Sequence, residues 1–424
     1  MITVACILIP VTHSISPLTA VGGLSLLKRA ILTAQRAGAR TCYILTQGDT
    51  DTTQLREELK DEERLVAEVV WTRLADIPTA LQTEANEHCL CFSLHTLFQP
   101  SMAQNLDQTA QSGETWAVKA QNGTPALLLG PRDLSQYVLR LIIQIQETEG
   151  PGIETIPADK IKIYSALSHF VYKLSSQSSS SDSVQMGERA LLHSLENPRD
   201  GFVDAYLNRT LSRPLTRLFL RTSLNPNQIT LLSCFVGLLG AACFFQAGYW
   251  GLVLGALLLQ LSAIVDCVDG EVARMKFLES PLGAWLDVTL DTVVHIATFL
   301  GLGFAVWTQG EIQSALFLGV LLAAGTVFSF PCVLIAQKTD TLGEQSTAWQ
   351  NQLLEKMISG LVSRDYSIFI LLAAIFQKLA WFLWVAAIGV HVFWITLLVL
   401  LVQTGRLKQA IRLLPASFLQ RFNS

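Results

Sequence analysis

The sequence has little charge. Only 15% of its 424 residues are Asp, Glu, Lys or Arg, whereas a soluble domain usually carries about a quarter. The net charge is −4 and there is no long basic tract, which argues against a nucleic-acid partner. The eight cysteines form no CxxC pair and no cluster with histidine, so the sequence offers neither a zinc motif nor a disulfide framework. Hydrophobic residues make up 50%, with a mean hydropathy of +0.40, and we expect part of the chain to lie in lipid.

Residues 1–173 predict a cytosolic α/β domain of the Rossmann-like type. The N-terminal run has no basic flank and no small-residue cleavage site, so a buried strand explains it better than a signal peptide. Ile2–Ile9 predicts a strand, Leu24–Ala37 a helix that stops at Gly38, and Arg40–Thr46 a second strand. This order is typical of a parallel sheet. Further strands are expected at Leu65–Trp71, Cys89–Ser93 and Pro125–Leu129.

A serine-rich stretch, residues 174–186, predicts a flexible linker. The following region, 187–228, is expected to be an amphipathic juxtamembrane segment. Its arginines recur every fourth residue with leucines between them, which on a helix gives a basic face beside an apolar one. Such a helix lies in the membrane surface with its cations near lipid phosphates, although an ordinary solvated face is the alternative. The arginines are Arg209, Arg213, Arg217 and Arg221.

Residues 229–405 predict six membrane-spanning helices. No Asp, Glu, Lys or Arg occurs from Ile229 to Val265, which is long enough for two spans of roughly 20 residues. We expect the turn between them at Gly248–Gly251. Four more apolar segments follow, the third of them short, at about 283–306, 312–337, 365–378 and 379–403.

Basic residues in the predicted loops indicate the topology. They gather in the loops on one side, whereas Lys378 alone falls on the other. The positive-inside rule therefore places both termini, including the tail 406–424, in the cytoplasm. The basic residues on the cytoplasmic side are Arg274, Lys276, Lys338, Lys356, Arg364, Arg406, Lys408 and Arg412.

Four aspartates lie where the second span ends and the third begins. Asp266 and Asp269 are three residues apart, and Asp287 and Asp291 are four apart, so each pair shares one helix face. Carboxylates inside a membrane are costly, and four together would repel one another unless cations lie between them. Oxygen ligands favour Mg²⁺ or Mn²⁺, and two such ions could hold a diphosphate. The alternative is that acids near a span end merely sit in the headgroup layer while small residues pack the helices.

The pattern Asp-x2-Asp-Gly-x2-Ala-Arg-x8-Gly-x3-Asp-x3-Asp, from Asp266 to Asp291, resembles the signature of the CDP-alcohol phosphotransferases. Every fixed position is met, which by chance would occur on the order of 10⁻⁹ per starting point. The resemblance covers about residues 186–405. It implies transfer of a phospho-alcohol group from a CDP-alcohol to an acceptor hydroxyl, with release of CMP, in phospholipid or polyol-phosphodiester synthesis.

The resemblance also implies roles for individual residues. Asp266, Asp269 and Asp287 would bind the pair of metal ions, while Asp291 would touch one ion and act as the general base. The segment from Asn225 to Thr230 looks like the family's Pro-Asn-x-x-Thr entry to the first span, although its asparagines could equally be plain helix caps. The residues implied around the nucleotide are Gly270, Ala273, Arg274, Gly283, Asn227 and Thr230.

Two further residues near the motif have open roles. His295, one turn beyond Asp291, could tune the base, but a packing role is the commoner fate of a lone histidine in a span. Arg364, followed by Asp365 at the start of the fifth span, could bind an acceptor phosphate or simply set the topology.

The N-terminal stretch Val21–Arg29 is similar to sugar-phosphate nucleotidyltransferases, and its fusion to six spans resembles the bifunctional inositol-phosphate cytidylyltransferase and di-inositol-phosphate-phosphate synthase family. Those enzymes carry a glycine-rich loop with an arginine after the first strand, because backbone amides and a cation hold the NTP phosphates. Here Pro10–Pro17 has no glycine, lysine or arginine, and Phe92–His95 stands where a metal-binding Asp is expected. We therefore expect an inactive domain with a regulatory, scaffolding or acceptor-capture role.

The resemblance leaves the substrates open. The donor is either CDP-diacylglycerol or a soluble CDP-polyol, and the acceptor hydroxyl could belong to a polyol phosphate. We expect a homodimer in the lipid bilayer. The rival interpretations are an ion or metal transporter, whose acids would line a conduction path, and a membrane scaffold without catalysis.

Overall fold

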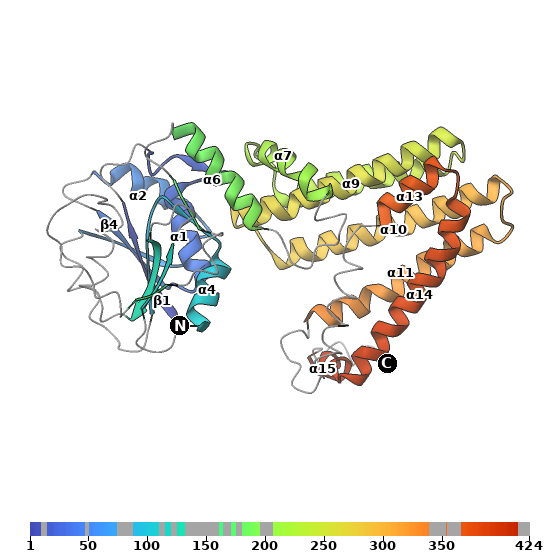
Figure 1. Cartoon of the computed structure of the whole chain (residues 1–424). Helices are drawn as coiled ribbons and strands as arrows, with labels where there is room; N and C mark the ends of the chain where they lie inside the picture. Colours follow the sequence, from blue (N-terminus) through green and yellow to red (C-terminus); the bar gives the residue numbers. More distant parts are fainter. Residues whose placement is uncertain are drawn as a thin grey trace. The chain divides into compact units, whose positions relative to one another are not determined.

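The structure is a computed structural model that describes residues 1–9, 15–46, 51–73, 88–109, 115–119, 125–131, 161–163, 171–174, 180–195, 207–338, 353 and 366–413. The chain divides into two compact units. The first comprises Met1–Leu195 with Met275–Phe277, and the second comprises Glu196–Arg274 with Leu278–Ser424. The first unit is a sheet with helices and the second is helical (Figure 1), as the sequence predicts.

The sheet of the first unit has seven strands in the order β10-β8-β9-β6-β1-β4-β5. The strand β1 (Ile2–Leu8) is buried along its whole length and pairs in parallel with β4 (Thr41–Thr46) and β6 (His88–Ser93). Such a strand is apolar on both faces because it lies in the middle of a covered sheet. The predicted parallel arrangement is confirmed, except that β9 (Pro125–Pro131) runs antiparallel to both neighbours. The other strands are β2 (Ala20–Val21), β3 (Leu24–Ser25), β5 (Glu68–Arg73), β7 (Thr96–Leu97), β8 (Thr115–Lys119), β10 (Ile161–Ile163) and β11 (Tyr172–Lys173).

The crossover helix α1 (Leu26–Ala37) connects β1 to β4. It begins two residues later than predicted, because Ser25 is its N-cap and accepts a hydrogen bond from the Lys28 amide. It ends where Gly38 adopts a φ of 123°, a conformation that side chains rarely allow. The other helices of this part are α2 (Thr53–Lys60) and α4 (Pro100–Thr109).

The predicted linker 174–186 is wrong in its second half, because α6 (Ser180–Ser194) begins there. Asp182 lies in its first turn, where a negative charge is favourable. The helix belongs to the first unit, since Glu188 accepts a 2.8 Å hydrogen bond from the Gly22 amide. The unit therefore extends to Leu195 rather than to residue 173. Composition alone suggested disorder, but the leucines that follow the serines supply a buried face.

Among the described residues, the second unit contains six apolar helices in the predicted order. Five are long and apolar enough to cross a membrane, and the fifth in sequence, α13 (Tyr366–Ile375), has only 10 residues. The turn expected at Gly248–Gly251 lies slightly earlier, because α9 already begins at Tyr249. The five long helices are α8 (Pro226–Phe244), α9 (Tyr249–Lys276), α10 (Pro281–Thr308), α11 (Ala315–Lys338) and α14 (Leu379–Gln403). Two shorter amphipathic helices are α7 (Arg209–Leu220) and α15 (Arg406–Leu413).

Glycines allow these helices to approach closely. A Cβ atom added at Gly240 would lie 2.9 Å from the Gly255 carbonyl oxygen, and one at Gly303 would lie 2.9 Å from the Ala315 carbonyl oxygen and from the Gly319 Cα. The pairs α8–α9 and α10–α11 therefore meet backbone against backbone, as small residues permit in membranes.

Candidate functional site

Three of the four predicted carboxylates gather at one point. Oxygen atoms of Asp266, Asp269 and Asp287 all lie within 4.8 Å of one another, which is close enough to hold a metal ion. Asp269 is 6% exposed, and the other two are partly exposed. The fourth, Asp291, lies one turn along α10 from Asp287 and lines the same cavity. The short connection between α9 and α10 thus places two acidic helix faces opposite each other.

Hydroxyl groups of α8 approach two of these carboxylates. Thr230, which is 3% exposed, donates a 2.5 Å hydrogen bond to Asp269 Oδ2. Ser233 Oγ lies 3.4 Å from Asp266 Oδ1. The resemblance suggested Thr230 as a nucleotide contact, whereas the structure places its hydroxyl on a carboxylate, where it fixes the orientation of that side chain. Ser233 was not predicted, because its spacing from Asp266 in the sequence carries no signal.

The small residues of the motif lie beside polar groups. A Cβ atom at Gly283 would approach Asn227 Oδ1 to 3.0 Å, and one at Gly270 would approach Arg274 Nη1 to 3.4 Å. Asn227 and Gly283 therefore face each other across α8 and α10. Ala273 and Arg274 are half-buried on α9. Asn225, not Asn227, is the N-cap residue of α8, and its amide donates to Gln228 Oε1 at 3.0 Å, so the capping alternative does not apply to Asn227.

An elongated cavity of 820 Å³ opens beside the carboxylates. Residues at four-residue steps of α10 line it, from Asp287 through Asp291 and His295 to Phe299, which corresponds to about 18 Å along the helix. It is acidic at the Asp287 end, whereas the remaining wall is mainly apolar. Cys267 is also in the lining. The aromatic side chains in the lining are Phe299, Phe330, Tyr366, Phe369, Trp381, Phe382 and Phe393.

The histidine of this cavity packs against aromatic rings. The His295 ring meets Tyr366 edge-on, with centroids 5.2 Å apart, and lies 6.3 Å from the Phe299 ring. These contacts favour the packing role. Arg364, the other residue whose role the sequence left open, lies outside the described residues.

A second buried carboxylate, Glu271, was missed by the sequence analysis. It is 2% exposed and accepts hydrogen bonds from Arg209 Nη1 at 3.0 Å and Ser212 Oγ at 2.9 Å, as well as from the Thr216 hydroxyl. These donors all come from α7. The expectation that the arginine stripe of α7 reaches lipid is therefore wrong for Arg209, which is 9% exposed and paired inside the protein.

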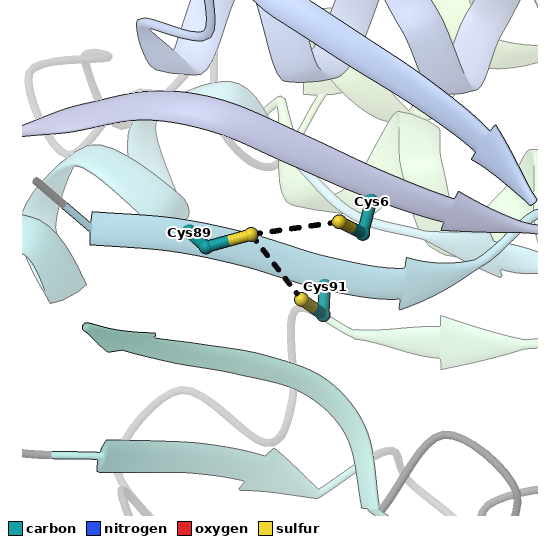
Figure 2. Close-up of side chains that lie close together, drawn as sticks. All are labelled: Cys6, Cys89 and Cys91. Atoms are coloured by element: carbon teal, nitrogen blue, oxygen red, sulfur yellow. Dashed lines mark hydrogen bonds between the residues drawn. The ribbon is translucent and has the colours of Figure 1, made fainter. Parts of the chain in front are cut away.

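Three thiols of the first unit also lie together. Cys89 Sγ is 3.6 Å from both Cys6 Sγ and Cys91 Sγ, and the three sulfur atoms point toward one another from β1 and β6 (Figure 2). They are close enough to bind one metal ion. Contact with the neighbouring thiols and burial raise the pKa of Cys6 and Cys91 well above the usual range. Cys6 and Cys91 therefore stay protonated at neutral pH, and the three side chains pack as small apolar groups.

Residues Phe92–His95 of the first unit stand where nucleotidyltransferases carry a metal-binding Asp, and they are buried. Ser93 ends β6, and His95 is 1% exposed with its Nε2 atom 2.9 Å from the Ile15 carbonyl oxygen. Residues 10–14, which belong to the segment compared with the glycine-rich loop, are not among those described. The Val21–Gly23 turn is held by Arg29, whose guanidinium donates to the carbonyl oxygens of Val21 and Gly22. Burial lowers the pKa of Arg29 to about 10.

Comparison with known proteins agrees with this geometry. A family profile described as CDP-alcohol phosphatidyltransferase matches residues 223–402. A phosphatidylinositol phosphate synthase of Streptomyces avermitilis is 31% identical over 203 residues, which cover 44% of this chain and 76% of the relative. An archaetidylinositol phosphate synthase of Methanothermobacter thermautotrophicus is 31% identical over 143 residues, covering 31% and 71%.

A third relative has a more limited overlap. The bifunctional IPC transferase and DIPP synthase of Aquifex aeolicus is 38% identical over 98 residues, which cover 23% of this chain and 22% of the relative. The aligned part thus spans less than a quarter of that bifunctional protein.

The apolar helices and the comparisons together define the class of protein. With five helices of spanning length and composition among the residues described, the chain is a multi-pass integral membrane protein. This chain covers more than two thirds of the length of each of two relatives at 31% identity, and the family profile spans all four aspartates of the motif. The chain therefore belongs to the CDP-alcohol phosphatidyltransferase family.

Proposed function

We propose that this protein transfers a phospho-alcohol group from a lipid CDP-alcohol to the hydroxyl group of a polar acceptor and releases CMP. The observation that carries the proposal is the position of the carboxylate cluster, which opens into a long, mainly apolar cavity. Family membership favours this transfer over the transporter and scaffold interpretations.

The carboxylates fit a divalent metal. Three oxygen donors from different side chains lie within 4.8 Å, which suits an ion that prefers oxygen ligands. We propose Asp266, Asp269 and Asp287 as ligands, with Asp291 contributing to a second ion, and Mg²⁺ or Mn²⁺ as the metal. When bound, the ions would neutralise the acidic cluster and the diphosphate of the donor.

The protein side chains then have defined tasks. Asp291 accepts the proton of the acceptor hydroxyl, whose oxygen forms a bond to the phosphorus that carries the alcohol. The bond from that phosphorus to the bridging oxygen breaks, and CMP leaves with the electron pair. We propose that Gly283, Gly270 and Ala273 let the nucleotide approach the helices. Asn227 and Arg274 are proposed as donors of hydrogen bonds to it.

The cavity favours a lipid donor over a soluble CDP-polyol. Its volume of 820 Å³ lies in the upper range for small-molecule sites, and its aromatic wall continues from the carboxylates toward Phe299 and Trp381. A polyol would leave this wall without an apolar partner, whereas hydrocarbon chains would cover it. The two relatives at 31% identity are named as synthases of inositol phosphate lipids, which supports a polyol phosphate as the acceptor.

We also propose that the first unit has lost nucleotidyltransferase activity, since His95 and Arg29 are bound to carbonyl oxygens of their own unit. Cytoplasmic termini are proposed from the distribution of basic residues. The expected homodimer stays a prediction.

The test is CMP release by the purified full chain in detergent with Mg²⁺. Wild-type protein should release CMP from CDP-diacylglycerol with an inositol phosphate acceptor, and Asp291→Asn should lower the rate by about 10²–10⁴-fold. The matched control is Glu311→Gln, an exposed acid outside the cavity, which should retain the rate. CMP release only with CDP-inositol as the donor would overturn the proposal of a lipid donor. Equal rates of CMP release by Asp291→Asn and wild type would overturn the proposed role of Asp291 as the general base.

A further inference from the structure

The helix that carries half of the acidic cluster is held from two sides. On one side, Thr230 and Ser233 of α8 reach Asp269 and Asp266. On the other, Glu271 is bound by α7. Because successive helix residues are rotated by about 100°, Glu271 points nearly opposite to Asp269.

The contact between α7 and α9 has a second attachment point. Gln260 Nε2 donates to Asn208 Oδ1 at 2.6 Å, and Ser367 Oγ of α13 donates to Gln260 Oε1 at 2.7 Å. Gln260 lies 11 residues before Glu271, which is three turns and therefore the same face of α9. The two attachment points are about 16 Å apart along that helix. Together they fix the rotation and the axial position of α9 against α7.

All members of this network are buried. Asn208, Ser212, Thr216 and Ser367 are 0% exposed, and Gln260 is 7% exposed. A buried ion pair adds little net stability compared with apolar packing, whereas loss of one partner leaves an uncompensated charge. In some proteins, groups of this kind select one arrangement of the elements that they join. Tyr366, which lines the cavity, is adjacent to Ser367, so the same network also reaches the cavity wall.

We infer that Glu271 is a positioning residue for the acidic cluster: through Arg209, Ser212 and Thr216 it holds α9 in the rotation that turns Asp266 and Asp269 toward Asp287. This inference rests on the proposed function, because it concerns the carboxylates proposed as metal ligands. Ligand sites lose much of their affinity when supporting groups are removed, since displacements near 1 Å are enough to spoil the geometry.

The experiment is a Mn²⁺ titration followed by electron paramagnetic resonance, on the full chain in detergent, which reports binding without turnover. Glu271→Gln keeps the side-chain shape but removes the charge opposite Arg209. We expect its Mn²⁺ dissociation constant to rise at least tenfold. If that variant does not fold, Ser212→Ala, which retains the ion pair and removes one donor, should shift the constant in the same direction by a smaller factor.

The control separates positioning from stability. His391 of α14 joins that helix to α11 through the Leu321 carbonyl oxygen, 3.1 Å from its Nε2 atom, and accepts a 2.8 Å hydrogen bond from the Trp394 indole of its own helix. It is not in the lining of the cavity. His391→Phe should lower the melting temperature and leave Mn²⁺ affinity unchanged. Two results would overturn the inference and leave the proposed function standing. One is wild-type Mn²⁺ affinity in both Glu271→Gln and Ser212→Ala, and the other is a loss of Mn²⁺ affinity in His391→Phe equal to that in Glu271→Gln. Absence of Mn²⁺ binding by wild-type protein would overturn the proposed metal site, and the inference with it.

Discussion

The two units of the chain bury polar groups in different ways. In the first unit, Arg29 and His95 are bound to backbone carbonyl oxygens, and three thiols pack against one another. In the second, carboxylates are bound to hydroxyl groups and gather beside a cavity. Backbone partners stabilise the fold of the unit that contains them, whereas several charges of one sign at a cavity require a ligand. The partners of a buried polar side chain, rather than its degree of burial, therefore distinguish a structural role in the first unit from a functional role in the second.

The contrast predicts that a hydroxyl group beside the acidic cluster supports metal binding and not only helix packing. Removal of the Thr230 hydroxyl tests this with the largest expected effect. Thr230→Val keeps the shape and removes the hydrogen bond to Asp269. Because groups that orient metal ligands are worth about 10–100-fold in affinity, the Mn²⁺ dissociation constant should rise by that factor. Calorimetric titration of the full chain measures it. An unchanged constant would show that Thr230 serves only to pack α8 on α9.

A smaller effect should come from the backbone contact of α10 with α11. Gly303→Ala would place a Cβ atom 2.9 Å from the Ala315 carbonyl oxygen, so the helices must separate, at a cost of about 1–3 kcal/mol. Unfolding of the full chain in detergent measures this cost. The matched control is Gly389→Ala on α14, where the added atom would meet nothing within 4 Å. Equal stability of the two variants would contradict the close contact.

The smallest expected effect concerns a buried thiol of the first unit. Burial raises the pKa of Cys42 from 9.0 to about 12. Because the folded unit keeps this proton longer than the unfolded chain, its contribution is fully present below pH 9 and is lost as pH rises toward 12. At pH 10 the loss is about 1.4 kcal/mol relative to pH 8.

Urea unfolding of the full chain at pH 8 and pH 10 tests this loss. Cys42→Ala serves as the reference, since it lacks the titrating group and should lose less stability between the two values. The same pH dependence in both proteins would mean that other groups cause the decline.

The sequence could predict the part of the site that is formed by segments close together along the chain. Asp266, Asp269 and Asp287 lie on two consecutive helices with a short connection, so their spacing alone brings them together. The same reasoning predicted the parallel pairing of β1 with β4 through one crossover helix. Local periodicity suffices where the partners are close along the chain.

Long-range partners were not predictable in this way. Glu271 contacts Arg209, which lies 62 residues earlier, and no local pattern distinguishes an arginine that pairs inside the protein from one that reaches lipid. The helical period placed the arginines on one face of α7 but could not identify the neighbour of that face. Similarly, the serine content of residues 174–186 concealed the start of α6, whose stability depends on contacts such as Glu188 with Gly22.

The cavity wall carries a consequence for chemical reactivity. Cys267 is half-buried in that wall, directly after Asp266, whereas the thiols of the β-sheet are sealed inside their unit. An alkylating reagent small enough to enter would meet this sulfur beside the carboxylates, and a bound substrate would shield it. The rate of Cys267 alkylation would thus report whether the cavity is occupied, without an engineered label.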